Sequence, residues 1–166
     1  MPKTGRMTQW GVGPKFAALS LVAALILLTV NIFYFPSLLL PFNQIRFGFG
    51  IALFLFGTSI FFVAATQIHR AFNNGKLATN GVYAYMRHPV YAVWILFVAP
   101  GLLLVTGALF LIAMIFIMYA LFRMLTVEED SYLEQKFGKD FLDHKKRVNS
   151  IVPKLRRKLL PIDQSN

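Results

Sequence analysis

Residues 90–125 read VYAVWILFVAPGLLLVTGALFLIAMIFIMYALFRML and contain a single basic residue and no acidic one. The stretch divides into two apolar runs, 90–105 and 108–125, which only Thr106 and Gly107 separate. A connection this short forces a tight reversal of the chain, so the two runs predict a helical hairpin. The first run corresponds to only about 24 Å of helix, and Pro100-Gly101 within it should bend it.

The remainder of the chain is similarly apolar. Two further runs, 16–40 and 47–68, each supply the roughly 20 apolar residues that a spanning helix needs. Of the 166 residues, 57% are hydrophobic and 14% are charged, whereas about a quarter are charged in a soluble domain. We therefore expect an all-α, polytopic membrane protein with about four transmembrane helices, the first of which is retained and not cleaved as a signal peptide. The sequence has no cysteine, which excludes disulfides, iron–sulfur clusters, zinc–thiolate sites and a cysteine nucleophile.

The distribution of charge predicts the orientation in the membrane. If both termini and the 69–89 loop share one side, sixteen of the seventeen Lys and Arg residues lie on that side and only Arg46 lies opposite. The positive-inside rule then places the termini, this loop and any site beside it in the cytoplasm. We expect a prokaryotic inner membrane and not the endoplasmic reticulum.

The chain is expected to form one membrane-embedded domain, 1–166, made of N-terminal helices (1–72), a core (73–153) and a basic tail (154–166). In the polar sequence after the fourth apolar run, Thr126 should cap a cytoplasmic helix. The four-residue spacing of Leu133, Phe137 and Phe141 suits packing on an apolar surface. Gly138 should interrupt this helix, and the basic, partly apolar sequence beyond it should rest on anionic headgroups.

The segment YAYMRHPVYAVW, residues 83–94, places charge and proline at the start of the third apolar run. Pro89 suits the first turn of a helix, where its missing N–H is not needed. Local features allow two interpretations of the neighbouring side chains. Arg87, His88 and the tyrosines are either interfacial anchors or ligands for a polar molecule held at the membrane surface.

A second motif favours the ligand interpretation. GVYAYMRHPVY is followed about forty residues later by EED.YL...FG..F..HKKRV...VP. Together these motifs resemble the isoprenylcysteine carboxyl methyltransferase family of integral-membrane methyltransferases, over roughly residues 79–153. The resemblance implies an S-adenosylmethionine pocket at the cytoplasmic ends of the last helices, closed by the C-terminal segment.

The resemblance also implies which residues bind the cofactor. The positions that match the family's motifs are Tyr83, His88, Pro89, Val90, Tyr91 and Glu129, and less closely Leu77 and Ala78. The chemistry agrees, because a carboxylate such as Glu129 can accept hydrogen bonds from the ribose diol. Arg87 or His88 could bind the methionine carboxylate, and tyrosine faces attract a sulfonium cation.

The sequence departs from the family at one position on the acceptor side. The prenylcysteine enzymes carry a substrate-binding arginine four residues before the glutamate, where this chain has Leu125. Arg123 is the candidate replacement, although on a helix it is turned about 160° away. The acceptor is therefore a prenylated cysteine carboxylate by resemblance, or alternatively a phospholipid or a hydrophobic amine or thiol.

Two other function classes stay open on the sequence: a sterol-reductase-like membrane enzyme and a non-enzymatic membrane protein. The expected partners are a lipophilic acceptor and membrane lipids, and no nucleic acid is expected. We expect His69 to be an interfacial anchor and His144 to be solvated, and no metal site is expected. The sequence predicts neither the oligomeric state nor a catalytic base.

Overall fold

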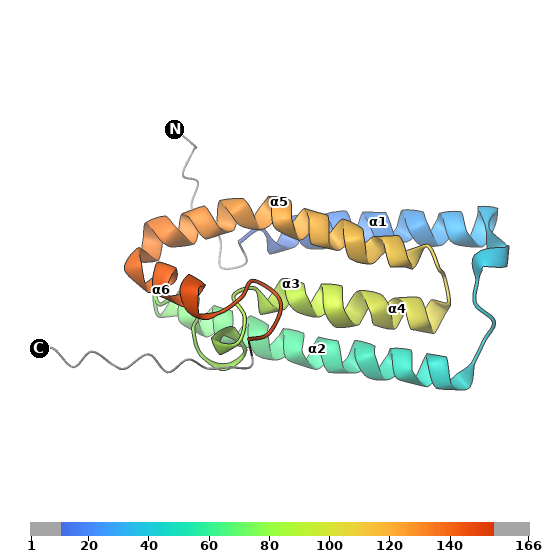
Figure 1. The fold of residues 1–166 in the computed structure, drawn as a ribbon, viewed down its shortest axis with the longest axis horizontal. Coiled ribbons are helices and arrows are strands. Elements are labelled where there is room, and N and C mark those ends of the chain that lie inside the picture. Colours follow the sequence, from blue (N-terminus) through green and yellow to red (C-terminus); the bar gives the residue numbers. More distant parts are fainter. Residues whose placement is uncertain (1–10, 155–166) are drawn as a thin grey trace, which may run out of the picture.

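The computed structural model describes residues 11–154, which form a bundle of helices (Figure 1). The α-helices are α1 (Gly13–Tyr34), α2 (Gln44–Asn73), α3 (Pro89–Val93), α4 (Ala99–Thr106), α5 (Leu111–Phe137) and α6 (Lys139–Arg147). Short 3₁₀ turns occupy Pro36–Leu38 and Gly81–Ala84, and a π-helical turn, Trp94–Val98, joins α3 to α4. The described residues contain isolated bridges but no β-strand, so the all-α prediction is confirmed.

Four helical units are long and apolar enough to cross a membrane, as the sequence predicted. They are α1, α2, the continuous α3–α4 unit and α5. The α3–α4 unit lies between α2 and α5, and α1 runs beside α5 (Figure 1). Large apolar side chains point away from the bundle; Phe33 and Phe116 are 75% and 71% exposed. An apolar outer surface of this extent requires lipid around it, so the protein is an integral membrane protein.

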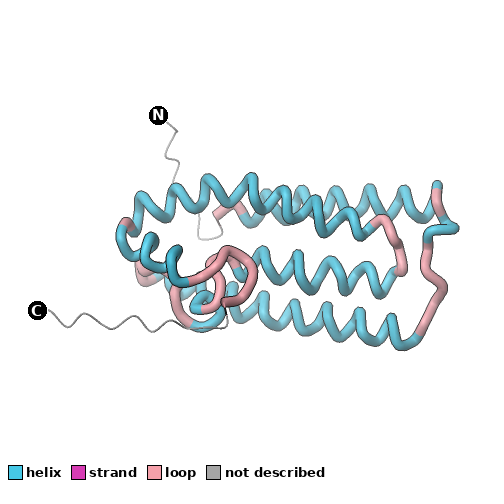
Figure 2. The backbone as a smooth tube through the Cα atoms, in the orientation of Figure 1, coloured by secondary structure: helices cyan, strands magenta, loops and turns pink. Residues whose placement is uncertain are grey.

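The loops at one end of the bundle fasten the predicted hairpin (Figure 2). Gly107 follows α4 with a φ of +72°, a left-handed conformation that glycine adopts without strain. The Arg46 guanidinium donates to the carbonyls of Leu104 at 2.8 Å and Pro41 at 3.1 Å. A Cβ at position 107 would stand 2.6 Å from Arg46 Nη1. The one arginine assigned to this end therefore holds the loop before α2 against the last turn of α4.

The distortion of the third span lies before Pro100-Gly101 and not at that pair. The Pro100 ring is incompatible with the normal bond to the carbonyl of Leu96, and the preceding turn widens so that Ala99 N–H donates to the carbonyl of Trp94. Gly101 serves close packing, because a Cβ there would stand 3.0 Å from the carbonyl oxygen of Gly50 on α2. Small residues thus let the two spans approach closely.

Two expectations about the polar C-terminal part were wrong, and one is confirmed. Thr126 does not cap a helix: it lies inside α5, its hydroxyl donates to the carbonyl of Phe122 at 2.7 Å, and the fourth span continues unbroken to Phe137. His144 is not solvated, because α6 folds back and leaves it only 4% exposed. Gly138, with a φ of +49°, does separate α5 from α6. The basic tail from residue 155 onward lies outside the described residues.

Candidate active site

A cavity of about 280 Å³ lies at the end of the bundle where α3 begins and α5 turns into α6. Its walls come from the start of α1, the last turns of α2, the loop that follows α2, and helices α3, α5 and α6. This volume is close to the lower end of the roughly 300–1,000 Å³ typical of small-molecule sites. The lining is largely aromatic and aliphatic, with a few charged groups.

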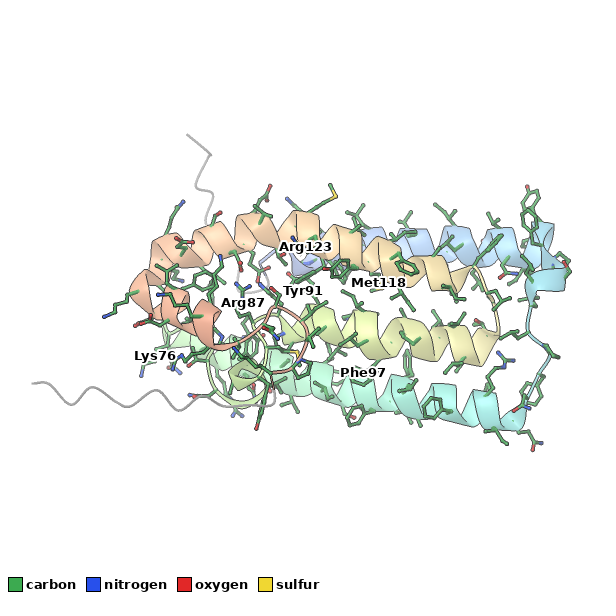
Figure 3. All side chains as sticks on the ribbon, in the orientation of Figure 1. Lys76, Arg87, Tyr91, Phe97, Met118 and Arg123 are labelled. Carbon is green, nitrogen blue, oxygen red and sulfur yellow. The ribbon has the colours of Figure 1, made fainter. Side chains whose placement is uncertain are left out.

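Eight of the nine candidate cofactor-binding residues line this one cavity. They are Leu77, Ala78, Tyr83, Arg87, His88, Val90, Tyr91 and Glu129. Pro89 is the exception: it is buried as the first residue of α3 and sets the start of that helix. Arg123, the candidate on the acceptor side, is exposed on α5 (Figure 3). It lines a separate depression together with Tyr119 and Val127. The structure therefore brings the two sequence motifs together and leaves Arg123 outside.

The contact between the motifs is a short hydrogen bond inside the cavity. The hydroxyl of Tyr91 on α3 donates to Glu129 Oε2 on α5 at 2.7 Å. His88 lies beside both, with its Nδ1 3.9 Å from Glu129 Oε1 and its ring 5.9 Å from that of Tyr91. Gly11 closes the group from the N-terminal side, since a Cβ there would stand 3.0 Å from the Glu129 carboxyl carbon. The carboxylate is thus held in place while one oxygen makes no hydrogen bond to the described residues.

Asp130 organises the wall behind this group. Its carboxylate accepts from Arg87 Nη1 at 2.8 Å, lies 3.1 Å from His88 Nε2 and is 3.5 Å from Lys145 Nζ. Arg87 Nη2 also donates to the hydroxyl of Ser150 at 2.7 Å. These bonds tie the start of α3, α5, α6 and the following loop into one unit. Sequence reasoning missed this role of Asp130, because it depends on the residues that face Asp130 from α6 and the start of α3.

Two buried polar atoms at the cavity have no hydrogen-bond partner among the described residues. They are Arg87 Nε and His144 Nε2. Unpaired polar groups are costly to bury, and both atoms are closed off from solvent. Burial and the positive charges of Arg147, Arg87 and His88 lower the pKa of His144 to about 4, which keeps its ring neutral at pH 7. Burial, and secondarily Glu129, raises the pKa of Tyr83, so its phenol stays protonated.

Several cavity residues carried no sequence prediction as ligands: Trp94, Tyr132, Lys136, Phe141 and His144. Lys76 belongs to the stretch 75–78, which the resemblance matched only weakly to cofactor contacts, and it also lines the cavity. Phe141 belongs to the apolar spacing that predicted helix packing, and it is 1% exposed. Lys136 gave no signal, because surface lysines are common near membrane interfaces and only the fold shows that this one lines a cavity.

Fold and cavity together define an integral membrane protein with a ligand-sized site at one end of its helices. The model of the isoprenylcysteine carboxyl methyltransferase family matches residues 50–135, just over half of the chain. The chain therefore belongs to the isoprenylcysteine carboxyl methyltransferase family.

Named relatives agree with this assignment. The protein-S-isoprenylcysteine O-methyltransferase of Dictyostelium discoideum is 35% identical over 77 residues, which cover 46% of this chain and 32% of that protein. Protein-S-isoprenylcysteine O-methyltransferase B of Arabidopsis thaliana is 26% identical over 148 residues, covering 84% of this chain and 74% of that protein. The human protein-S-isoprenylcysteine O-methyltransferase is 28% identical over 113 residues, covering 63% and 40% respectively. The chain thus spans well under half the length of the first and third of these relatives.

Proposed function

We propose that this protein transfers a methyl group from S-adenosylmethionine to a lipophilic acceptor, by family default the carboxylate of a prenylated cysteine. One observation carries the proposal: two motifs about forty residues apart meet in one cavity, where Tyr91 donates to Glu129 at 2.7 Å. The relatives reported above are named as prenylcysteine methyltransferases, which favours this acceptor over phospholipids, amines and thiols.

The residues of the cavity fit the proposed methyl donor. When bound, S-adenosylmethionine supplies an activated methyl group on a sulfonium cation. The Glu129 carboxylate offers acceptors for a ribose diol, and the faces of Tyr83, Tyr91 and Trp94 can attract the cation.

The protein's task is then mainly to align two reactants and to exclude water. The start of α1 and helix α6 cover the cavity from two sides, with Phe16 and Phe141 buried in them. A carboxylate or thiolate acceptor is already nucleophilic, so methyl transfer to it needs no general base; a protonated amine would first have to lose a proton.

We also propose that the cavity and both termini face the cytoplasm, in a prokaryotic inner membrane. Of the basic residues in 11–154, Arg46 alone lies at the hairpin end, and the others lie on α1, α2, α5, α6 and their loops toward the cavity end. This asymmetry is what the positive-inside rule requires. Reporter fusions in the 41–46 loop and at the C-terminus should give opposite signals, and equal signals would contradict this orientation.

Methyl transfer can be tested directly with labelled S-adenosylmethionine and purified protein in lipid. The acceptors are a farnesylated cysteine analogue with a free carboxylate, a phospholipid, a lipid amine and a lipid thiol. We expect label in the farnesylated acid, and much less of it when the protein carries Glu129→Gln and the cofactor concentration is near the wild-type KM. Label only in the thiol or the amine would support methyltransferase activity but would show that the acceptor is not a prenylated cysteine carboxylate. No transfer to any acceptor, with intact protein, would refute the proposal.

A further inference from the structure

Two lysines line the cavity without a counter-ion. Lys136 lies in the last turn of α5, and Lys76 lies in the loop that follows α2 (Figure 3 labels Lys76). No ion pair within residues 11–154 includes either lysine. The third cation at the cavity, Arg87, is already committed through its two terminal nitrogens to Asp130 and Ser150.

Aromatic rings hold the Lys136 ammonium in place but do not neutralise it. Its Nζ lies 5.0 Å from the ring centroid of Phe72, 5.8 Å from that of Tyr132 and 5.3 Å from that of Phe137. All three rings also line the cavity. Cation–π contacts of this kind orient a cation and leave its N–H donors free for an anion.

Lys136 lies on the same face of α5 as Glu129. Seven residues separate them, which corresponds to a rise of about 10 Å and a rotation only about 20° short of two full turns. One helix face thus presents an acceptor group at one level of the cavity and an unpaired cation two turns further on. A ligand that fits both has hydroxyl donors at one end and an anionic group at the other.

We propose that Lys136, supported by Lys76, forms a carboxylate-binding subsite of this cavity. The inference rests on the proposed function, because both reactants of that reaction carry a carboxylate: the amino-acid part of the methyl donor and the free acid of a prenylated cysteine. Arg123 and Leu125 do not line the cavity, so the positive charge for either carboxylate comes from these lysines.

Lys136→Gln is the test variant, and Lys139→Gln is its control, because Lys139 is an exposed lysine that lines no part of the cavity. Calorimetry on the purified full chain uses two probes, S-adenosylhomocysteine and 5′-methylthioadenosine, which lacks the amino-acid part. If the donor's carboxylate is bound, Lys136→Gln weakens S-adenosylhomocysteine about ten-fold or more and leaves 5′-methylthioadenosine unchanged.

If the acceptor's carboxylate is bound instead, both affinities stay unchanged and the KM for the farnesylated free acid rises by a similar factor. Lys136→Arg keeps the charge, so it should retain most of the wild-type affinity or KM, whichever Lys136→Gln changes. A purely structural role of Lys136 would not predict this. The double variant carries both Lys136→Gln and Lys76→Gln. If Lys136→Gln and the double variant both bind and turn over as the wild type does, the subsite is overturned and the proposed function is not. A wild type that neither binds S-adenosylhomocysteine nor methylates would refute the proposed function and the subsite with it.

Discussion

Removing the charge of Asp130 should loosen the wall behind the cavity, because this carboxylate joins Arg87 and His88 at the start of α3 to Lys145 on α6. The contacts are 2.8 Å to Arg87, 3.1 Å to His88 and 3.5 Å to Lys145. The side chains of Arg87 and His88 are only 11% and 3% exposed, so water cannot replace the lost partner efficiently. Asp130→Asn keeps the size of the side chain and one acceptor oxygen while it removes the charge.

The expected loss follows from the burial of the pair. Breaking a fully buried ion pair costs about 3–5 kcal/mol. Asp130 is 20% exposed and asparagine can still accept one bond, so we expect a loss of about 2 kcal/mol in the free energy of unfolding. For a chain of this size that corresponds to a melting temperature roughly 4–8 °C lower.

Thermal unfolding of purified protein in one detergent measures this loss. Asp140→Asn is the matched control: Asp140 is an exposed aspartate in the first turn of α6, and it forms no ion pair within 11–154. Its substitution should change stability by well under 1 kcal/mol. If Asp130→Asn has the same melting temperature as the control and the wild type, Asp130 does not hold the start of α3 and α6 together.

Further predictions concern the two glycine contacts and the buried histidine. Gly11 has a φ of +53°, and Gly11→Ala places a Cβ 3.0 Å from the Glu129 carboxyl group, so this variant should bind S-adenosylhomocysteine more weakly. In Gly13→Ala the nearest atom to the new Cβ is 3.9 Å away, so this variant should bind normally in the same titration. Gly107→Ala should lower the melting temperature of the bundle, because its Cβ meets the guanidinium that clamps the hairpin; a wild-type melting temperature would disprove that contact. His144 has a pKa of about 4 in the fold against the usual 6.5, so the unfolded chain takes up its proton first and stability falls as pH drops from about 6.5 toward 4. Between pH 7.5 and 5 the wild type should lose about 2 kcal/mol more than His144→Gln, and parallel pH profiles would contradict this.

The sequence predicted the number of spans and the hairpin well, because apolar runs and a two-residue connection leave little freedom. It failed where tertiary packing decides. The hydroxyl of Thr126 can serve a cap or bond back to the preceding turn, and only the continuity of α5 selects the second. His144 looked solvated because its sequence neighbours are charged; its burial depends on the direction in which α6 folds after Gly138.

The candidate site was predicted mainly through its motifs. Eight candidate residues line one cavity, which spacing along the chain alone could not have established. The roles of Asp130 and Lys136 were missed, because each depends on what faces it from another helix. An aspartate beside a glutamate, or a lysine near a helix end, is equally compatible with a solvated surface.

Calorimetric titration with S-adenosylhomocysteine tests the central claim most directly. We expect saturable binding to the wild-type protein and a loss of about 1.5–3 kcal/mol in Glu129→Gln, or roughly ten- to a hundred-fold in affinity. The amide oxygen of the substituted side chain would still accept the Tyr91 hydroxyl, so the cavity keeps its shape. Glu128→Gln is the control, since Glu128 is exposed and lines no part of the cavity, and it should bind as the wild type does. No binding by folded wild-type protein, or equal affinity in the two variants, would contradict the account.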